Sequence, residues 1–393
     1  MEAKARLEGW PARLYALHLW AIVALFLSNV FLCLTIVAEL ITRRFSPRQP
    51  SVWARTPHVR VPFYLYIALL AISIAVSYDP RMSLRAGGEI LSLATLPLAF
   101  VLIRRRRNIR LLIDGFCVVA TGSALWGLAQ LLTGYGDLHH RIRGRFSHYM
   151  TFAGVLLLAD VLLISHLVSH PLSWKNWRWP ALVLVNLGLV GSLTRSAWVA
   201  LVATLIVLAL MRAPKSLLAF IPIGALLVLL APAGVRERIL SIGDLHNVTN
   251  YDRLCMAEAG LHMIAEKPFF GLGPRMVRER YPIYRSPTAP RDTVQHLHNT
   301  YLQLAAGRGL PALGVYLWLV LAAMTVAYRG YRRERNELYL GAFLALLAFS
   351  LAGLFEANWI DTEIQRVVLF LVAVPYLLRE SETEEETETL RAG

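Results

Sequence analysis

Three basic side chains stand where they could take part in a group transfer. Arg195 lies in SLTRSAW, between two apolar runs with almost no loop around it. Arg253 opens the helix-forming segment RLCMAEAGLHMIA, and His298 opens HNTYLQLAAGRGLPALG, which leads into an apolar run. Guanidinium groups bind phosphate oxygens in a fork, and an imidazole accepts a proton near neutral pH. These residue types predict a site that binds a diphosphate leaving group and deprotonates a hydroxyl.

Each of these residues also has a simpler explanation. Arg195 could be an anchor that extends to the membrane surface from a tight turn. His298 could be a loop histidine that precedes a helix capped by Asn299, and His296 could compete with it for a role in proton transfer. The sequence leaves these alternatives open.

Two further segments carry the same ambiguity. Arg253 could pair with Asp252 or Glu258 as an ordinary solvated charge. Arg145 and His148, in GRFSHYMTFAG, precede an apolar run and are candidates for substrate binding or for anchoring at the membrane interface.

Motifs for other kinds of catalysis are missing from the sequence. There is no DxD, HExxH, GxSxG or P-loop pattern, and no pair of carboxylates has the spacing of metal ligands. The three cysteines show no CxxC spacing. The sequence therefore predicts a site with no metal and no cofactor.

Composition indicates the elements that must position these residues. The 393 residues are 56% hydrophobic and only 17% charged, whereas soluble domains carry about 25% charged residues. The net charge of +14 comes from short arginine clusters between apolar runs, which is typical of membrane proteins and not of nucleic-acid binding. We expect one integral membrane domain over residues 1–393, all-α and polytopic.

Apolar runs of about 20 residues predict about twelve membrane helices. The first run divides into two helices if it breaks near Ser28–Asn29, and eleven spans result if it does not. The runs fall near residues 14–41, 61–78, 86–103, 111–134, 150–170, 180–194, 196–212, 216–233, 300–327, 338–356 and 364–378.

Arginine and lysine clusters between these runs assign the two faces of the domain. The clusters that begin at residues 43, 104, 175, 212 and 329 fall on one face, which the positive-inside rule makes cytoplasmic. The acidic tail, residues 380–393, would lie there too, without fixed structure. The opposite face carries a large loop, residues 234–299, with a second helical stretch that begins at Arg275. We expect this loop to form a helical cap.

Four segments, taken in order, resemble the O-antigen ligase and polymerase superfamily of bacterial envelope enzymes. They are GRFSHYMTFAG, SLTRSAWVAL, YDRLCMAEAGLHMIAEKPFFGLGP and HNTYLQLAAGRGLPALGVYLWL. The resemblance implies about twelve membrane helices of the membrane glycosyltransferase type, with a periplasmic helical loop over the site. It also implies that the protein lies in the bacterial inner membrane, surrounded by membrane lipids, with its site facing the periplasm.

The resemblance also implies an activity. Ligases of this family transfer a glycan from undecaprenyl diphosphate to a sugar hydroxyl of lipid A–core, by a metal-independent inverting transfer. The key family residues fall on Arg195, Arg253 and His298, which would be catalytic. Arg145, His148, Arg275 and Asn299 would bind substrate.

Other activities stay open at this stage. A polymerase that joins two lipid-linked repeat units, or an oligosaccharyltransferase that acts on proteins, would use a similar site. A transporter would need several charges at the centres of its spans. Asp114 and Asp160 lie within apolar runs, but no buried basic residue is expected to match them.

Overall fold

The computed structural model describes residues 9–45, 52–137, 140–171, 173 and 175–392, and all regular structure in them is helical. The predicted all-α polytopic membrane fold is confirmed. Six helices in these residues are long and apolar enough to cross a membrane: α2 (Leu25–Phe45), α4 (Pro57–Ala75), α8 (Arg106–Gln130), α9 (Tyr149–Leu167), α11 (Arg195–Arg212) and α17 (Leu310–Glu334).

Shorter apolar helices account for most of the remaining predicted spans. The predicted span 86–103 is two helices that meet at Ala94, whereas the predicted spans 180–194, 216–233 and 338–356 are each a single helix. These elements are α6 (Gly87–Leu93), α7 (Thr95–Leu102), α10 (Arg178–Gly191), α12 (Leu217–Leu230) and α18 (Glu337–Ala352).

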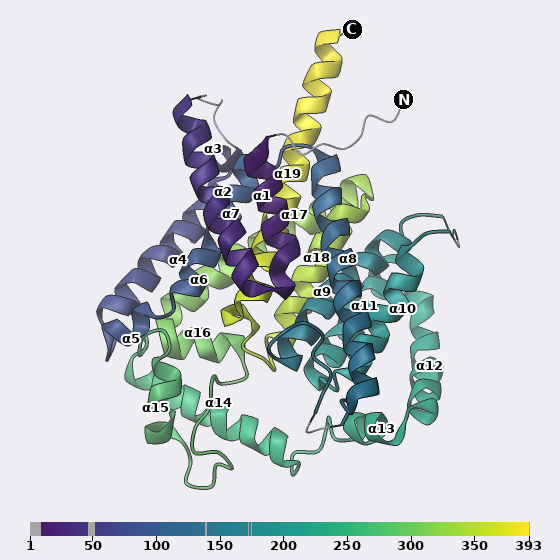
Figure 1. Cartoon of the computed structure of the whole chain (residues 1–393). Coiled ribbons are helices and arrows are strands. Elements are labelled where there is room, and N and C mark those ends of the chain that lie inside the picture. Colours follow the sequence, from purple (N-terminus) through teal and green to yellow (C-terminus); the bar gives the residue numbers. More distant parts are fainter. Residues whose placement is uncertain (1–8, 46–51, 138–139, 172, 174, 393) are drawn as a thin grey trace.

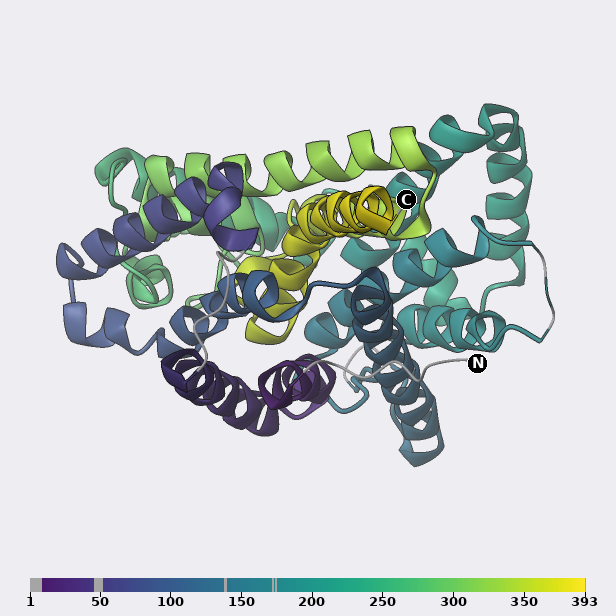
Figure 2. The same ribbon diagram turned by 90° about the horizontal axis from the view of Figure 1, so that it is seen from above.

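Helix α19 (Thr362–Ala392) lies at the centre of the bundle, where Figure 2 shows it between α17 and the N-terminal helices. It packs against α7, α9, α17 and α18, so residues such as Val368, Leu369 and Val372 are fully buried. An apolar surface on all sides suits a helix in this position. The helix continues to Ala392, so the acidic tail expected to be without fixed structure is helical instead.

The first apolar run forms an antiparallel hairpin of α1 (Trp10–Trp20) and α2 (Figure 1). The break falls at Ala21–Ala24, a few residues before the predicted position at Ser28–Asn29. Ser28 instead lies inside α2, where its hydroxyl accepts a hydrogen bond from Arg366 at 2.6 Å. The polar pair in the sequence therefore marks a contact with α19, not a turn.

The loops predicted to share the cytoplasmic face do meet at one end of the bundle. Ion pairs join them: Arg55 with Glu380 at 2.5 Å and Arg106 with Glu334 at 2.9 Å. Near the same end, Arg178 at the start of α10 lies 2.6 Å from Asp114 of α8. Asp114 is thus matched by a basic residue, contrary to the expectation from sequence.

The segment 234–299 forms a helical layer across the opposite end, at the bottom of Figure 1. It contains α13 (Ala233–Leu240), α14 (Val248–Glu266) and α15 (Met276–Tyr284). Asn247 caps α14 by accepting a hydrogen bond from the Thr249 N–H at 3.1 Å. Arg253 consequently lies in the second turn of α14 and does not open it, as the sequence had suggested.

The predicted span 300–327 is two helices, α16 (Thr300–Arg308) and α17, separated at Gly309. Gly309 has a φ of +88°, a conformation that interrupts a helix and favours glycine. The freed backbone groups pair with the loop after α14: Leu310 N–H donates to Pro268 at 2.7 Å, and Leu272 N–H donates to Ala306 at 2.8 Å. The GLGP turn therefore fixes α16 beside the cap.

Candidate functional site

Arg195, Arg253 and His298 line one cavity of about 390 Å³ between the bundle and the cap. They come from the start of α11, from α14 and from the loop that precedes α16. The convergence of these residues, expected from sequence, is a feature of the structure, and Asn299 lies on the same cavity wall.

Arg195 is the first residue of α11 and is only 5% exposed. Its Nη1 donates to the Ser241 carbonyl at 2.6 Å and to Oγ of the same residue at 2.9 Å, and its Nη2 donates to Asn250 Oδ1 at 2.7 Å. Arg195 therefore ties the membrane helix to α13 and α14. This geometry differs from that of an anchor extended toward the membrane surface.

Arg253 is partly buried and has no ion pair among the described residues. The predicted alternative, a pair with Asp252, does not form, because Asp252 lies 3.1 Å from Arg291 instead. Burial lowers the pKa of Arg253, although the nearby Glu356 carboxylate opposes that shift. The guanidinium thus keeps donors available to a ligand in the cavity.

His298 belongs to a cluster with Glu356 and His296. The Nδ1 atom of His298 lies 3.1 Å from Glu356 Oε2, and the Nε2 atom of His296 lies 3.4 Å from Oε1. His298 has a φ of +49°, an uncommon conformation for a residue other than glycine. The Glu356 contact and a 3.3 Å hydrogen bond from the His298 N–H to His296 Nδ1 hold it there. Such local strain is often found at functional sites.

The Glu356 carboxylate is negatively charged at neutral pH. Burial opposes its ionisation, but the hydrogen bond with His298 and the neighbouring charges of His296, His298 and Arg253 outweigh that effect and lower the pKa of Glu356 to about 2. Burial also lowers the pKa of His296 to about 4, so this ring is neutral. The His298 ring beside the Glu356 carboxylate matches the arrangement of a general base and its orienting group.

Glu356 was not predicted as part of the site. The sequence places it among scattered acidic residues, in the short loop between α18 and α19 and 58 residues after His298. The sequence places Glu356 on the same face as the HN segment, but several other acidic residues share that face. This position is therefore too weak an indication to select one carboxylate.

Asn299 caps α16. Its Oδ1 accepts hydrogen bonds from the N–H groups of Tyr301 and Leu302 at 2.9 and 3.0 Å, and its Nδ2 donates to the Leu354 carbonyl at 2.9 Å. The capping role left open by the sequence is thus present. Asn299 fixes the start of α16 and hence the position of His298.

Two arginines that were not among the predicted site residues lie near the cluster. Arg141 stacks over the Tyr149 ring, with Cζ 4.3 Å from the ring centroid. Arg238 donates from Nε to the Leu193 carbonyl at 3.3 Å. Burial, followed by the charges of Arg195 and Arg141, lowers the pKa of Arg238 to about 10. Four guanidinium groups therefore influence one another here, which favours binding of an anion.

The motif GRFSHYMTFAG places His148 near this site and Arg145 at the surface. His148 caps α9, and its Nδ1 accepts from the Met150 N–H at 3.2 Å. Burial lowers the pKa of His148, and the charges of Glu356 and His298 also act on it, so it lies near the cluster. Arg145 is exposed and lies over the Trp126 ring, 5.5 Å from its centroid. The structure does not bring Arg145 into the cavity.

Arg275 is also outside this cavity. It has a φ of +66° at the turn before α15, and its Nη1 donates to the Arg85 carbonyl at 3.1 Å. It lines a second cavity, on the other flank of α16. The sequence grouped Arg275 with the residues of the first cavity, because no local pattern separates the two cavities.

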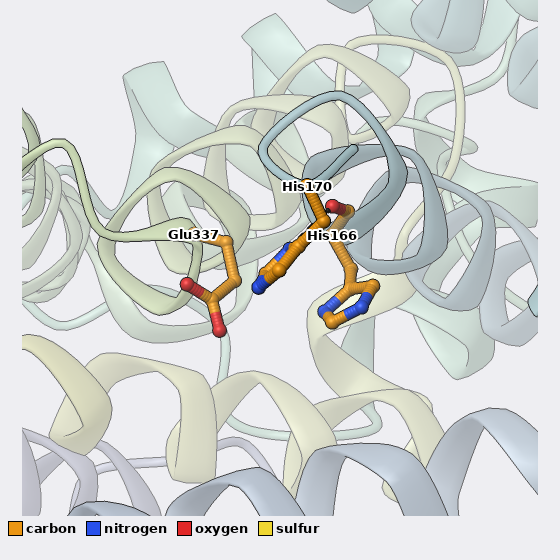
Figure 3. Close-up of side chains that lie close together, drawn as sticks. All are labelled: His166, His170 and Glu337. Carbon is orange, nitrogen blue, oxygen red and sulfur yellow. Dashed lines mark hydrogen bonds between the residues drawn. The ribbon is translucent and has the colours of Figure 1, made fainter. Parts of the chain in front are cut away.

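Two groups of side chains in the described residues have a composition suited to a metal ion. His296, His298 and Glu356 are one, and the hydrogen bonds above account for their proximity. The other is His166, His170 and Glu337 at the opposite end of the bundle (Figure 3). There the two rings stack at 4.0 Å with an interplanar angle of 18°. Lone pairs of parallel rings do not converge on one ion.

The comparison with protein families bears on this arrangement. Residues 180–317 match the family described as O-antigen ligase. This match supports membership of the chain in the O-antigen ligase and polymerase superfamily. A search of curated proteins finds no match. The matched segment contains Arg195, Arg253 and His298, whereas Glu356 and Arg141 lie outside it. The match therefore supports an O-antigen ligase or polymerase type of function, and it covers the segment that supplies most of the residues lining the cavity.

Proposed function

We propose that this protein is an O-antigen ligase that transfers a glycan from undecaprenyl diphosphate to a sugar hydroxyl of lipid A–core. The reaction would take place at the periplasmic face of the bacterial inner membrane. One observation supports the proposal above the others: Arg195, Arg253 and His298 of the matched family segment line a single cavity at the end of the bundle opposite the arginine clusters assigned to the cytoplasm.

His298 is the proposed general base. Its Nδ1–H would donate to Glu356, which leaves Nε2 to accept the proton of the acceptor hydroxyl. The hydroxyl oxygen then forms a bond to the anomeric carbon as the bond from that carbon to the diphosphate oxygen breaks. Undecaprenyl diphosphate leaves with the bonding electrons, and attack from the opposite side inverts the anomeric centre.

Arg253 is the proposed main contact for the leaving diphosphate, because it faces the cavity without an ion pair among the described residues. Arg195, Arg141 and Arg238 add positive charge around it. A fixed positive field at the position where negative charge develops stabilises the transition state, by about 2.7–4 kcal/mol for a single contact in well-studied cases. This arrangement requires no metal ion to neutralise the diphosphate.

The polyprenyl chain has an apolar surface beside the cavity. Leu254, Leu354 and Phe355 line the cavity and are 52%, 46% and 39% exposed. Exposed apolar side chains that adjoin a polar pocket are typical of a binding surface for an amphiphilic ligand. A lipid-linked diphosphate could therefore place its head group at Arg253 and its chain along these residues.

The test is an in vitro reaction with purified protein and a defined undecaprenyl-diphosphate-linked glycan. We expect product with lipid A–core as acceptor and none with His298→Ala. Product formed only with a second lipid-linked repeat unit would identify a polymerase instead.

The same assay separates an enzyme from a carrier. Transfer in detergent, where no second compartment exists, requires catalysis. Failure of every acceptor in detergent, together with movement of the lipid-linked glycan across sealed vesicles, would contradict the proposal and favour a transporter.

A further inference from the structure

A second cavity of about 270 Å³ lies on the flank of α16 opposite the candidate active site. Its walls come from segments far apart in the sequence: the turn between α5 (Pro80–Leu84) and α6, the start of α15, one side of α16 and the start of α19. The site described above does not use it.

Positive charge dominates the second cavity. Four arginines line it, whereas Glu89 is the one carboxylate among the lining residues. Glu89 is already engaged, because both of its oxygens accept hydrogen bonds from Nη2 of Arg308. Both side chains of that pair are buried, and the Arg308 Nε atom has no hydrogen-bond partner in the described structure. The lining residues other than this pair carry a surplus of positive charge.

Three guanidinium groups supply that surplus. Arg275 donates to the backbone carbonyl of Arg85, which holds the Arg275 guanidinium beside residue 85 without neutralising its charge. Arg278 has only a distant contact with Glu279, with Nε 3.8 Å from the carboxylate and both side chains 47% exposed. Exposed ion pairs of this kind contribute little free energy. Arg85, Arg275 and Arg278 therefore remain available to an anion.

The two cavities share a wall. Leu297 lines the first cavity and Gln303 lines the second, and the Leu297 N–H donates to Gln303 Oε1 at 3.0 Å. A substrate whose reacting hydroxyl lies at His298 could therefore extend past the end of α16. Gln295, Gln303 and Thr362 line the second cavity and offer amide and hydroxyl groups of the kind that bind sugars.

We propose that the second cavity binds a phosphate or carboxylate group carried by a saccharide substrate, through Arg85, Arg275 and Arg278. Arginine favours such oxyanions because its planar fork donates two parallel hydrogen bonds. The inference rests on the proposed function for the identity of the ligand as a saccharide. The anionic group belongs to the acceptor or to the donor glycan, and the experiment separates the two.

The experiment measures binding and transfer with full-length protein in lipid nanodiscs. Radiolabelled acceptor saccharide is prepared with its phosphate groups and after enzymatic removal of them, and the donor is prepared with a neutral or an acidic glycan. The variants are Arg85→Gln, Arg278→Gln and their combination. Arg81→Gln is the matched control, since Arg81 lies on α5 near Arg85 and does not line the cavity.

We expect the double variant to raise the Kd of the phosphorylated acceptor at least about tenfold, the scale of a lost charge-assisted contact, with an unchanged Kd for the dephosphorylated acceptor. Arg81→Gln should match wild type. If the loss follows the acidic donor glycan instead, the cavity serves the donor. Equal effects on charged and neutral ligands, or none, would overturn the anion site. If the wild-type protein shows charge-dependent binding but transfers no glycan, the proposed function is contradicted and the anion site is retained.

Discussion

The Glu356 carboxylate and the His298 imidazole lie 3.1 Å apart, although 58 residues and three helices separate them in the chain. His298 precedes α16, whereas Glu356 follows α18. The contact joins the segment matched by the family to a loop outside it, and it fixes which ring nitrogen of His298 faces the cavity.

Replacement of Glu356 by Gln tests this contact. Gln keeps the size of the side chain but removes the charge that orients and stabilises the protonated ring. We expect kcat to fall by about 10²-fold with little change in KM, and the pH dependence of kcat to change. Glu279→Gln, at an exposed position on α15, is the control. A wild-type rate for Glu356→Gln would exclude a role in positioning His298.

Replacement of Arg195 by Lys tests whether this residue acts through its fork. An ammonium group retains the charge but cannot reproduce contacts to both Ser241 and Asn250. We expect transfer to fall at least about tenfold. Asn250→Ala keeps Arg195 and removes one of its two anchoring residues, together with the hydrogen bonds from the Asn250 amide to the loop before α14. If both variants lose the same activity, Arg195 acts by holding the cap, and a much smaller loss in Asn250→Ala would favour direct contact with the diphosphate.

Two arginines of the 141–145 loop should differ in importance. Arg141 stacks on Tyr149 near the cluster, whereas Arg145 stacks on Trp126 outside the cavity. We expect Arg141→Gln to lower kcat/KM about tenfold and Arg145→Gln to remain close to wild type, measured with the same donor and acceptor. The reverse order would show that the cavity assignment of this loop is wrong.

Chelation tests the absence of metal from the reaction. His296, His298 and Glu356 have a composition that could bind zinc, but hydrogen bonds satisfy the contacts among them. We expect protein treated with EDTA and freed of chelator to keep its transfer rate. A loss that zinc or magnesium restores would contradict the proposed mechanism.

Acid should destabilise the protein in two separate pH ranges. The pKa of His296 is lowered from 6.5 to about 4, so the folded state resists protonation and stability falls as pH drops from 6.5 to 4. The pKa of Glu356 is lowered from 4.5 to about 2, so its contribution is present above pH 4.5 and is lost toward pH 2.

Thermal unfolding across this pH range provides the measurement. The variant His296→Gln should flatten the dependence of Tm on pH between 6.5 and 4, and Glu356→Gln should flatten it below 4.5. Curves that parallel wild type in both ranges would mean that these groups titrate normally in the folded protein.

Periodicity and apolar length predicted most of the membrane helices, because burial in lipid imposes a strong pattern on the sequence. The same reasoning missed the break at Gly309, since GRGLP lies within a continuous apolar run and only the backbone pairing with residues 268–273 reveals the turn. The side-chain partners Glu356 and Arg141 were not selected for a different reason. Their roles depend on which loops meet, and no local spacing encodes that.

The wall between the two cavities is fixed at both of its ends. Asn299 holds the start of α16 to Leu354. At the other end of α16, residues 268–273 are hydrogen-bonded to residues 306–310. A β-carbon on Gly271 or Gly309 would collide with the opposing backbone. An inserted residue in either segment would displace the linings of both cavities together. Adaptation to a new glycan is therefore expected to proceed by exchange of side chains on a frame of constant length.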